Sequence, residues 1–380
     1  MDLIYTDKLW RERGIITEGV FDLAYGSNEN DFKLTIRKKI EDITQGSLLF
    51  IEGTDFGGVV DKIGYNDENE EVYYEGRSWS GILDSKVIIP DPNSTYSGYV
   101  LPAGLLFQYA IVQLLEHIGA INNAGKQRTY KEDSITYNWS FDLLVDENVE
   151  SIAVEDNYVD PEDGQSHTEY ENLYLFKEYE TAYAGICEFI KSIGIILTFS
   201  VSRKVVDNFT ICVPNLVFKK ATDWTQKEEL DKYTLPITGT HLLNKTNHFI
   251  GLGNRITYRQ QRVKVHVYLK QDGTLTTDEN EKYYTGIDEI IKVEDFGNVE
   301  SSACAVEAMK KMKEIIEEDE FKLNLDASFS SHPYYVGDVI GRRDEILFDG
   351  DWIKRNVTKK IAKLEDDNLI IEYEIGGDPI

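Results

Sequence analysis

The chain has 380 residues, with 68 Asp and Glu residues against 40 Lys and Arg residues, and a formal net charge of −28 at pH 7. This excess of negative charge argues against binding to nucleic acid or to anionic membranes through a basic face. The length predicts more than one domain, and the 41% hydrophobic content with only 8 prolines is typical of an ordered globular protein.

The three cysteines, Cys187, Cys212 and Cys304, are odd in number and far apart, which favours reduced thiols in a protein made in a cytoplasm. The first residues, Met1 to Asp7, lack the basic and apolar parts of a signal peptide. No apolar run approaches the roughly 18 residues that span a bilayer. We therefore expect a soluble protein that is not conventionally secreted and does not insert into membranes.

The first part of the chain is rich in short predicted strands. Between Glu18 and Pro90, apolar residues alternate with polar ones in several runs, for example at Phe32, Leu34 and Ile36. Glycines separate these runs, and a stretch rich in turn formers, residues 91–98, ends them. This spacing predicts a small barrel or sandwich.

The middle of the chain mixes helices and strands. Leu105 to Ile118 is apolar on nearly every face, which predicts a buried helix, and Asn172 to Ile193 predicts a longer one that stops at Gly194. A hairpin of Ile195–Val201 and Phe209–Val213 is expected next.

A second mixed region follows. Val263 to Leu269 alternates strictly and predicts a strand, and Ser302 to Glu318 predicts an amphipathic helix. The last ~55 residues return to strands, among them Tyr335–Ile340, Trp352–Ile361 and residues 369–375.

The order β, α/β, α/β, β predicts a multidomain α+β protein. The expected domains are a tube-like barrel in 1–95, a first α/β domain in 96–240, a second in 241–325, and C-terminal strands of a second barrel in 326–380.

Three segments together resemble the opening barrel of baseplate hub, or tail-tip, proteins of long-tailed bacteriophages. They are Phe32–Ile36, Gly53–Asp61 and Tyr73–Leu83. The element that runs from Gly76-Arg77-Ser78 to Leu83 is the most specific part. The closing strands around Tyr335–Ile340 are similar to those that end the second barrel of such hubs. The same family includes the hub region of tail-associated lysin-like proteins, and it is related to hubs of contractile tails and type VI secretion spikes.

The resemblance implies a phage-hub-like fold with two small tube-type β-barrels flanking mixed α/β domains. It implies a homotrimer in the virion tail tip, assembled in the bacterial host cytoplasm. Its expected partners are a distal tail or tail-tube protein, the tape measure protein, and a spike, fibre or receptor-binding protein, with DNA present only in passage. An acidic lumen would let DNA pass without sticking.

Arg77, Trp79 and Leu83 are the only site residues that the sequence singles out. Aromatic and Arg side chains anchor many interfaces, so these three are candidates for contacts with a neighbouring subunit. They could equally be the packing that joins the barrel to the next domain. Both interpretations stay open.

Catalytic and metal motifs are weak in this chain, so we expect no enzyme activity, no cofactor and no metal. His241 and His248 lack the Glu of a zinc-binding helix, and the three cysteines show no linked His in the sequence. The acidic loop around Asp160 and Asp163 could bind calcium, although its spacing differs from the helix-loop-helix pattern.

Two other classes of function remain. One is a tail-associated cell-wall hydrolase, and the other is a carbohydrate-binding adsorption module. Activity of the purified chain on cell walls would favour the first, and binding of the isolated chain to host cell walls would favour the second.

Overall fold

The computed structural model describes residues 2–26, 29–90, 98–121, 130–132, 135–137, 140–154, 173–206, 208–227, 230, 233–235, 237–240, 246–255, 262–297, 299–317, 320–323, 333–344, 351–365 and 368–376. The chain forms two compact units. Unit 1 comprises Met1–Tyr158, Thr168–Pro236 and Leu323–Ile380, and unit 2 comprises Val159–His167 and Ile237–Lys322.

The strands are β1 (Leu3–Thr6), β2 (Glu12–Ile16), β3 (Val20–Gly26), β4 (Asp31–Ile36), β5 (Leu48–Ile51), β6 (Gly57–Asn66), β7 (Glu71–Ser78), β8 (Val100–Pro102), β9 (Tyr130–Glu132), β10 (Ile135–Tyr137), β11 (Asp142–Val145), β12 (Leu173–Leu175), β13 (Ile195–Val206), β14 (Phe209–Lys220), β15 (Ile237–Thr240), β16 (His248–Arg255), β17 (Arg262–Leu269), β18 (Leu275–Thr276), β19 (Ile291–Asp295), β20 (Glu320–Leu323), β21 (Val339–Asp344), β22 (Asp351–Glu365) and β23 (Asn368–Gly376).

The helices are α1 (Trp79–Asp84), α2 (Phe107–His117), α3 (Ala182–Ser192) and α4 (Ser301–Glu317), with short 3₁₀ turns η1 (Trp224–Gln226), η2 (Glu279–Glu281) and η3 (Gly286–Asp288). The strand-rich composition agrees with the α+β class expected from the sequence. No helix among the described residues is long and apolar enough to cross a bilayer.

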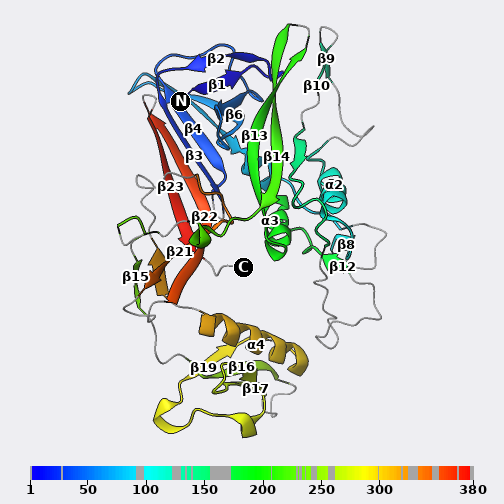
Figure 1. The fold of residues 1–380 in the computed structure, drawn as a ribbon, viewed down its shortest axis with the longest axis vertical. Helices are drawn as coiled ribbons and strands as arrows, with labels where there is room; N and C mark the ends of the chain where they lie inside the picture. The colour runs from blue at the N-terminus through cyan, green and yellow to red at the C-terminus, as the bar shows by residue number, and fades with distance from the viewer. Residues whose placement is uncertain are drawn as a thin grey trace. The chain divides into compact units, whose positions relative to one another are not determined.

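Unit 1 is built on a ten-stranded antiparallel sheet to which both ends of the chain contribute. Its strand order is β2-β1-β5-β6-β7-β4-β3-β22-β21, and β23 pairs with β22. The joint lies where Lys359–Glu365 of β22 pairs with Val20–Gly26 of β3. In Figure 1 the orange and red strands β21, β22 and β23 lie beside the blue strands β3 and β4.

The expected pair of barrels is therefore not found in the described residues. The C-terminal strands continue the N-terminal sheet instead of forming a sheet of their own, and the strand path from β2 to β21 does not close. The alternating apolar residues do form strands, but alternation only indicates which face of a strand is buried. Alternation does not indicate which strands are neighbours in a sheet. The two groups of strands, one near each end of the chain, therefore predicted two separate barrels.

A long hairpin and three helices complete the core of unit 1. The hairpin β13–β14 pairs over its full length, from Ile195↔Lys220 to Val206↔Phe209, and β11 adds to it in parallel. Phe107 of α2 lies between Phe189 of α3 and Phe218 of β14, with ring centroids 5.9 and 5.5 Å apart. Residues of the sheet, these helices and the hairpin share one buried cluster.

Two of the three helices expected from the sequence are confirmed as α2 and α4, but the first half of the expected helix from Asn172 is wrong. Residues 173–175 form β12, which pairs with β8. Tyr179 has a positive φ of 56°, which interrupts helical geometry, and the Thr181 side chain then caps α3 by accepting a hydrogen bond from the Ala184 amide.

Unit 2 contains a four-stranded sheet in the order β18-β17-β16-β19. Helix α4 covers β16 and β17, and Phe249 and Val267 pack against Ala308 and Met312. Gly251 lies under this helix, because a Cβ there would meet Ala308 at 3.0 Å. The small residue lets helix and strand approach closely.

Candidate functional site

The Gly76-Arg77-Ser78 element forms a junction between the sheet and the helices of unit 1. Strand β6 bulges at Asp61, where the register with β7 shifts between Val60 and Lys62. Gly76 lies against this bulge, because a Cβ there would meet the Val59 carbonyl oxygen at 1.9 Å. The motif therefore needs glycine for close approach of two strands.

Arg77 connects the bulge in β6 to the C-terminal end of α1 through hydrogen bonds. Its Nε and Nη2 donate to the two carboxylate oxygens of Asp61 at 2.8 and 2.9 Å, and its Nη1 donates to the Ser85 hydroxyl at 2.8 Å. The hydrogen bonds that Arg77 donates to Asp61 raise the pKa of Arg77. Such a bidentate salt bridge fixes the orientation of both side chains and pairs their charges.

Ser78 caps the N-terminus of helix α1, since its hydroxyl accepts a hydrogen bond from the Gly81 amide at 3.3 Å. Trp79 and Leu83, on that helix, are 1% and 0% exposed and belong to the main core cluster. Within this chain, Arg77, Trp79 and Leu83 thus join sheet to helices. A contact of any of them with a neighbouring subunit stays a prediction.

A buried ion pair ties the two ends of the chain together. Lys360 of β22 is 1% exposed, and its Nζ lies 2.9 and 2.8 Å from the Oδ1 and Oδ2 atoms of Asp55, in the turn between β5 and β6. The ammonium also faces the rings of Phe56 and Tyr335, 4.7 and 4.9 Å from their centroids. The Tyr25 hydroxyl donates to Asp55 as well.

The sequence did not predict this cluster of Asp55, Lys360 and the surrounding aromatic rings. Asp55 and Lys360 are 305 positions apart, and a lone lysine in a strand near the C-terminus gives no signal of its partner. Burial and the nearby Asp55 carboxylate raise the pKa of Tyr25 well above its ordinary value, so its hydroxyl remains a donor.

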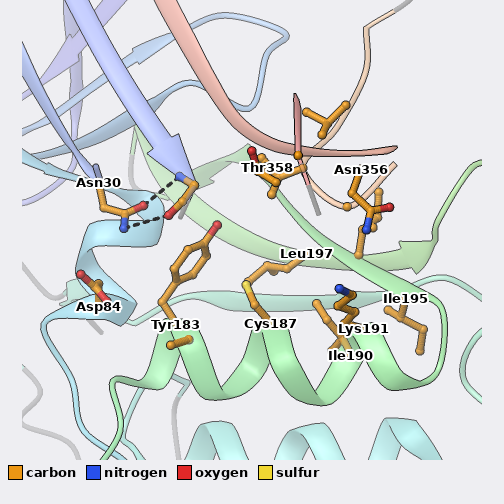
Figure 2. Close-up of a pocket in the computed structure, with 17 residues that line it drawn as sticks. Asn30, Asp84, Tyr183, Cys187, Ile190, Lys191, Ile195, Leu197, Asn356 and Thr358 are labelled. Carbon is orange, nitrogen blue, oxygen red and sulfur yellow. Dashed lines mark hydrogen bonds between the residues drawn. The ribbon is translucent and has the colours of Figure 1, made fainter. Parts of the chain in front are cut away.

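A cavity of about 350 Å³ lies between α3, the end of β3 and the middle of β22. Figure 2 shows Tyr183, Cys187 and Lys191 on α3 below the strand residue Thr358, with Asp84 at one side. Burial raises the pKa of Cys187 to about 12, despite a hydrogen bond with Tyr183 that lowers it. A thiol that stays protonated at neutral pH is a poor nucleophile, so this cavity does not resemble a cysteine active site.

A second polar cluster lies in unit 2. Nδ1 of His248 is 2.6 Å from Glu289 Oε1, and its Nε2 is 2.9 Å from His266 Nδ1. Lys282 lies 2.6 Å from the same carboxylate oxygen. These contacts hold the segment between η2 and β19 on the sheet.

In the part of the chain that the structure describes, no group of three or more His, Cys, Asp or Glu side chains could hold a metal ion. His241 and the suggested calcium loop around Asp160 and Asp163 lie outside the described residues.

No family model matches the chain, and no curated protein matches its sequence. Among solved structures, it resembles the prophage tail protein gp18 from Listeria monocytogenes EGD-e, with 10% identity and a TM-score of 0.46 over 100% of this chain and 95% of that one. It resembles the 43 kDa tail protein of prophage MuSo2 from Shewanella oneidensis, with 13% identity and a TM-score of 0.46 over 99% and 98%.

A topological model of the P2 virion baseplate in its activated conformation is similar over 100% of both chains, with 9% identity and a TM-score of 0.48. All three structures are phage tail or baseplate proteins. Identities and TM-scores this low do not assign the chain to their family.

Proposed function

We propose that the chain is a structural protein of a phage tail tip, a homotrimeric baseplate hub that surrounds the DNA channel and does no chemistry of its own. In this role it joins the tail tube and tape measure protein to the spike, fibre or receptor-binding apparatus. The order of the hub-like segments along the sequence supports the proposal. So does the junction at Gly76-Arg77-Ser78, where each of these three residues has a structural role.

The observation that carries the proposal is an open sheet edge at the C-terminal strand. Strand β23 has nine residues and, in the described part of the chain, pairs only with β22. Its Ile370 is 47% exposed. Monomeric proteins usually keep edge strands short or covered, because their free amides and carbonyls pair readily with another strand. An edge of this length suits a chain that adds to neighbours in a ring.

The molar mass of the purified chain, measured by light scattering over a concentration series, tests the proposal. We expect a mass of three copies at the higher concentrations, with rings in negative-stain images. A single-copy mass at every concentration, also after a tail-tube or distal tail protein is added, would reject the hub. Activity on cell walls that one carboxylate substitution abolishes would favour a hydrolase instead.

A further inference from the structure

A second cavity, of about 650 Å³, opens beside the junction in unit 1. Arg77 and Trp79 line it, together with Trp10 and Phe141. Lys8 and Lys86 line it as well, and no Asp or Glu is among the described residues of its wall. This basic cavity stands out in a chain with 68 acidic residues.

Among the described residues, Lys86 is the cation in this wall that has no carboxylate at ion-pair distance. Its Nζ donates to the carbonyl oxygens of Ile118 and Gly119, at 3.3 and 3.2 Å, where α2 ends. Within the described residues, no carboxylate lies at ion-pair distance from it, whereas Arg77 is paired with Asp61. Burial and the charge of Arg77 lower the pKa of Lys86. Helix-end carbonyls supply only partial negative charge, so a carboxylate from outside would stabilise this ammonium further.

We propose that the cavity receives an Asp- or Glu-bearing segment of a second copy of this chain, whose carboxylate pairs with Lys86. The inference rests on the proposed homo-oligomer. A copy with a net charge of −28 presents carboxylates over much of its surface, so its charge complements the basic cavity.

The test compares self-association of the full chain with that of three variants. Lys86→Glu reverses the charge in the cavity, and Lys86→Met removes it but keeps a side chain of similar length. Lys38→Glu, at an exposed position of unit 1, is the control with the same change in net charge. Circular dichroism establishes that each variant is folded.

We expect Lys86→Glu to raise the concentration at which half of the chains are assembled by roughly tenfold or more, with a smaller rise for Lys86→Met. Lys38→Glu should assemble like the wild type. If the wild type assembles and the Lys86→Glu variant assembles at the same concentration, the cavity contact is overturned and the hub proposal stands. A wild type that stays monomeric under all conditions would overturn both.

Carbodiimide cross-linking of wild-type chains gives a second readout that does not depend on a folded variant. It joins a lysine to a carboxylate in direct contact, and a mixture of isotopically light and heavy chains marks the cross-links between copies. We expect Lys86 among the inter-copy cross-links. Inter-copy cross-links at other lysines but none at Lys86 would reject the proposal, as would cross-links of Lys86 to an added tail protein only.

Discussion

At the scale of single residues, the pair formed by Asp55 and Lys360 shows how charge can specify a fold. Burying either group alone would be very unfavourable, so we expect the pair to favour a fold in which β22 lies beside the turn that carries Asp55. Aromatic rings around the ammonium exclude water and strengthen the attraction. We expect the pair to favour the register in which β22 joins the N-terminal sheet.

Removal of one member of this pair should strongly destabilise unit 1. We expect Asp55→Ala to lower the free energy of unfolding by about 3–5 kcal/mol, since Lys360 would stay buried without its carboxylate. Denaturant unfolding followed by tryptophan fluorescence measures the change. Glu41→Gln, which breaks an exposed pair with Lys39, is the matched control and should have little effect. Equal, small effects of both changes would show that the buried pair does not stabilise the sheet.

The cysteines give a second prediction at this scale. Burial raises the pKa of both Cys187 and Cys212 to about 12. Their thiols are protonated in the folded chain at pH values where unfolded chains carry thiolates, so the unfolded state binds fewer protons there. The free energy of unfolding should therefore fall as pH rises above the ordinary thiol pKa and through about 12. Urea midpoints measured from neutral to alkaline pH test this trend.

A matched experiment isolates the thiol contribution from other alkaline effects. In the double variant Cys187→Ala and Cys212→Ala, the fall in stability at high pH should be smaller than in the wild type. Identical pH profiles for the two proteins would contradict the assignment.

At the scale of elements, the sequence patterns predicted most strands and helices but not their neighbours. The alternation at Val263–Leu269 appears as β17, and the run from Leu105 appears as α2. Short-range patterns report which side of an element is buried. The pairing of β22 with β3 joins residues more than three hundred positions apart, and no local pattern encodes that contact.

The candidate site shows the same division between local and distant signals. The Gly76-Arg77-Ser78 motif could be found in the sequence because its residues are adjacent. Asp61, the partner of Arg77, ends another of the hub-like segments, Gly53–Asp61. Only the bulge in β6 explains why Arg77 and Asp61 meet. The Lys86 cavity could not be predicted, since its wall combines residues from positions 8 to 214.

The motif itself leads to a prediction about one glycine. Gly76→Ala places a methyl group 1.9 Å from the Val59 carbonyl oxygen, so β6 and β7 must separate at the bulge. We expect a clear fall in the thermal midpoint, on the order of several degrees, as for other overpacked sites. Gly376→Ala is the control, because its nearest neighbour would be 3.9 Å away. Similar midpoints for the two variants would mean that the close approach is not needed.

At the scale of the whole molecule, the shared sheet makes the first and last parts of unit 1 depend on each other. Strand β3 has β4 on one side and β22 on the other, so the N-terminal strands are incomplete without the C-terminal ones. The separate barrel expected in 1–95 would not need residues from 339 onwards. The two descriptions differ in a measurable way.

Truncation before β21 tests this dependence. We expect a chain that ends at Asp338 to lose its native near-ultraviolet circular dichroism and to aggregate, because the edge of β3 becomes exposed and Asp55 loses Lys360. A chain that lacks only residues 377–380 keeps β23 and should remain native. A soluble, natively folded truncation at Asp338 would instead support an independent N-terminal barrel.

We propose that copies of this chain assemble into a ring around a channel. Electron cryo-microscopy of the assembled protein tests this proposal most directly. We expect three copies around an open channel, with β23 against a neighbouring chain and carboxylates of that chain at Lys86. A compact particle without a channel, or an assembly in which both the β23 edge and the Lys86 cavity face solvent, would contradict it.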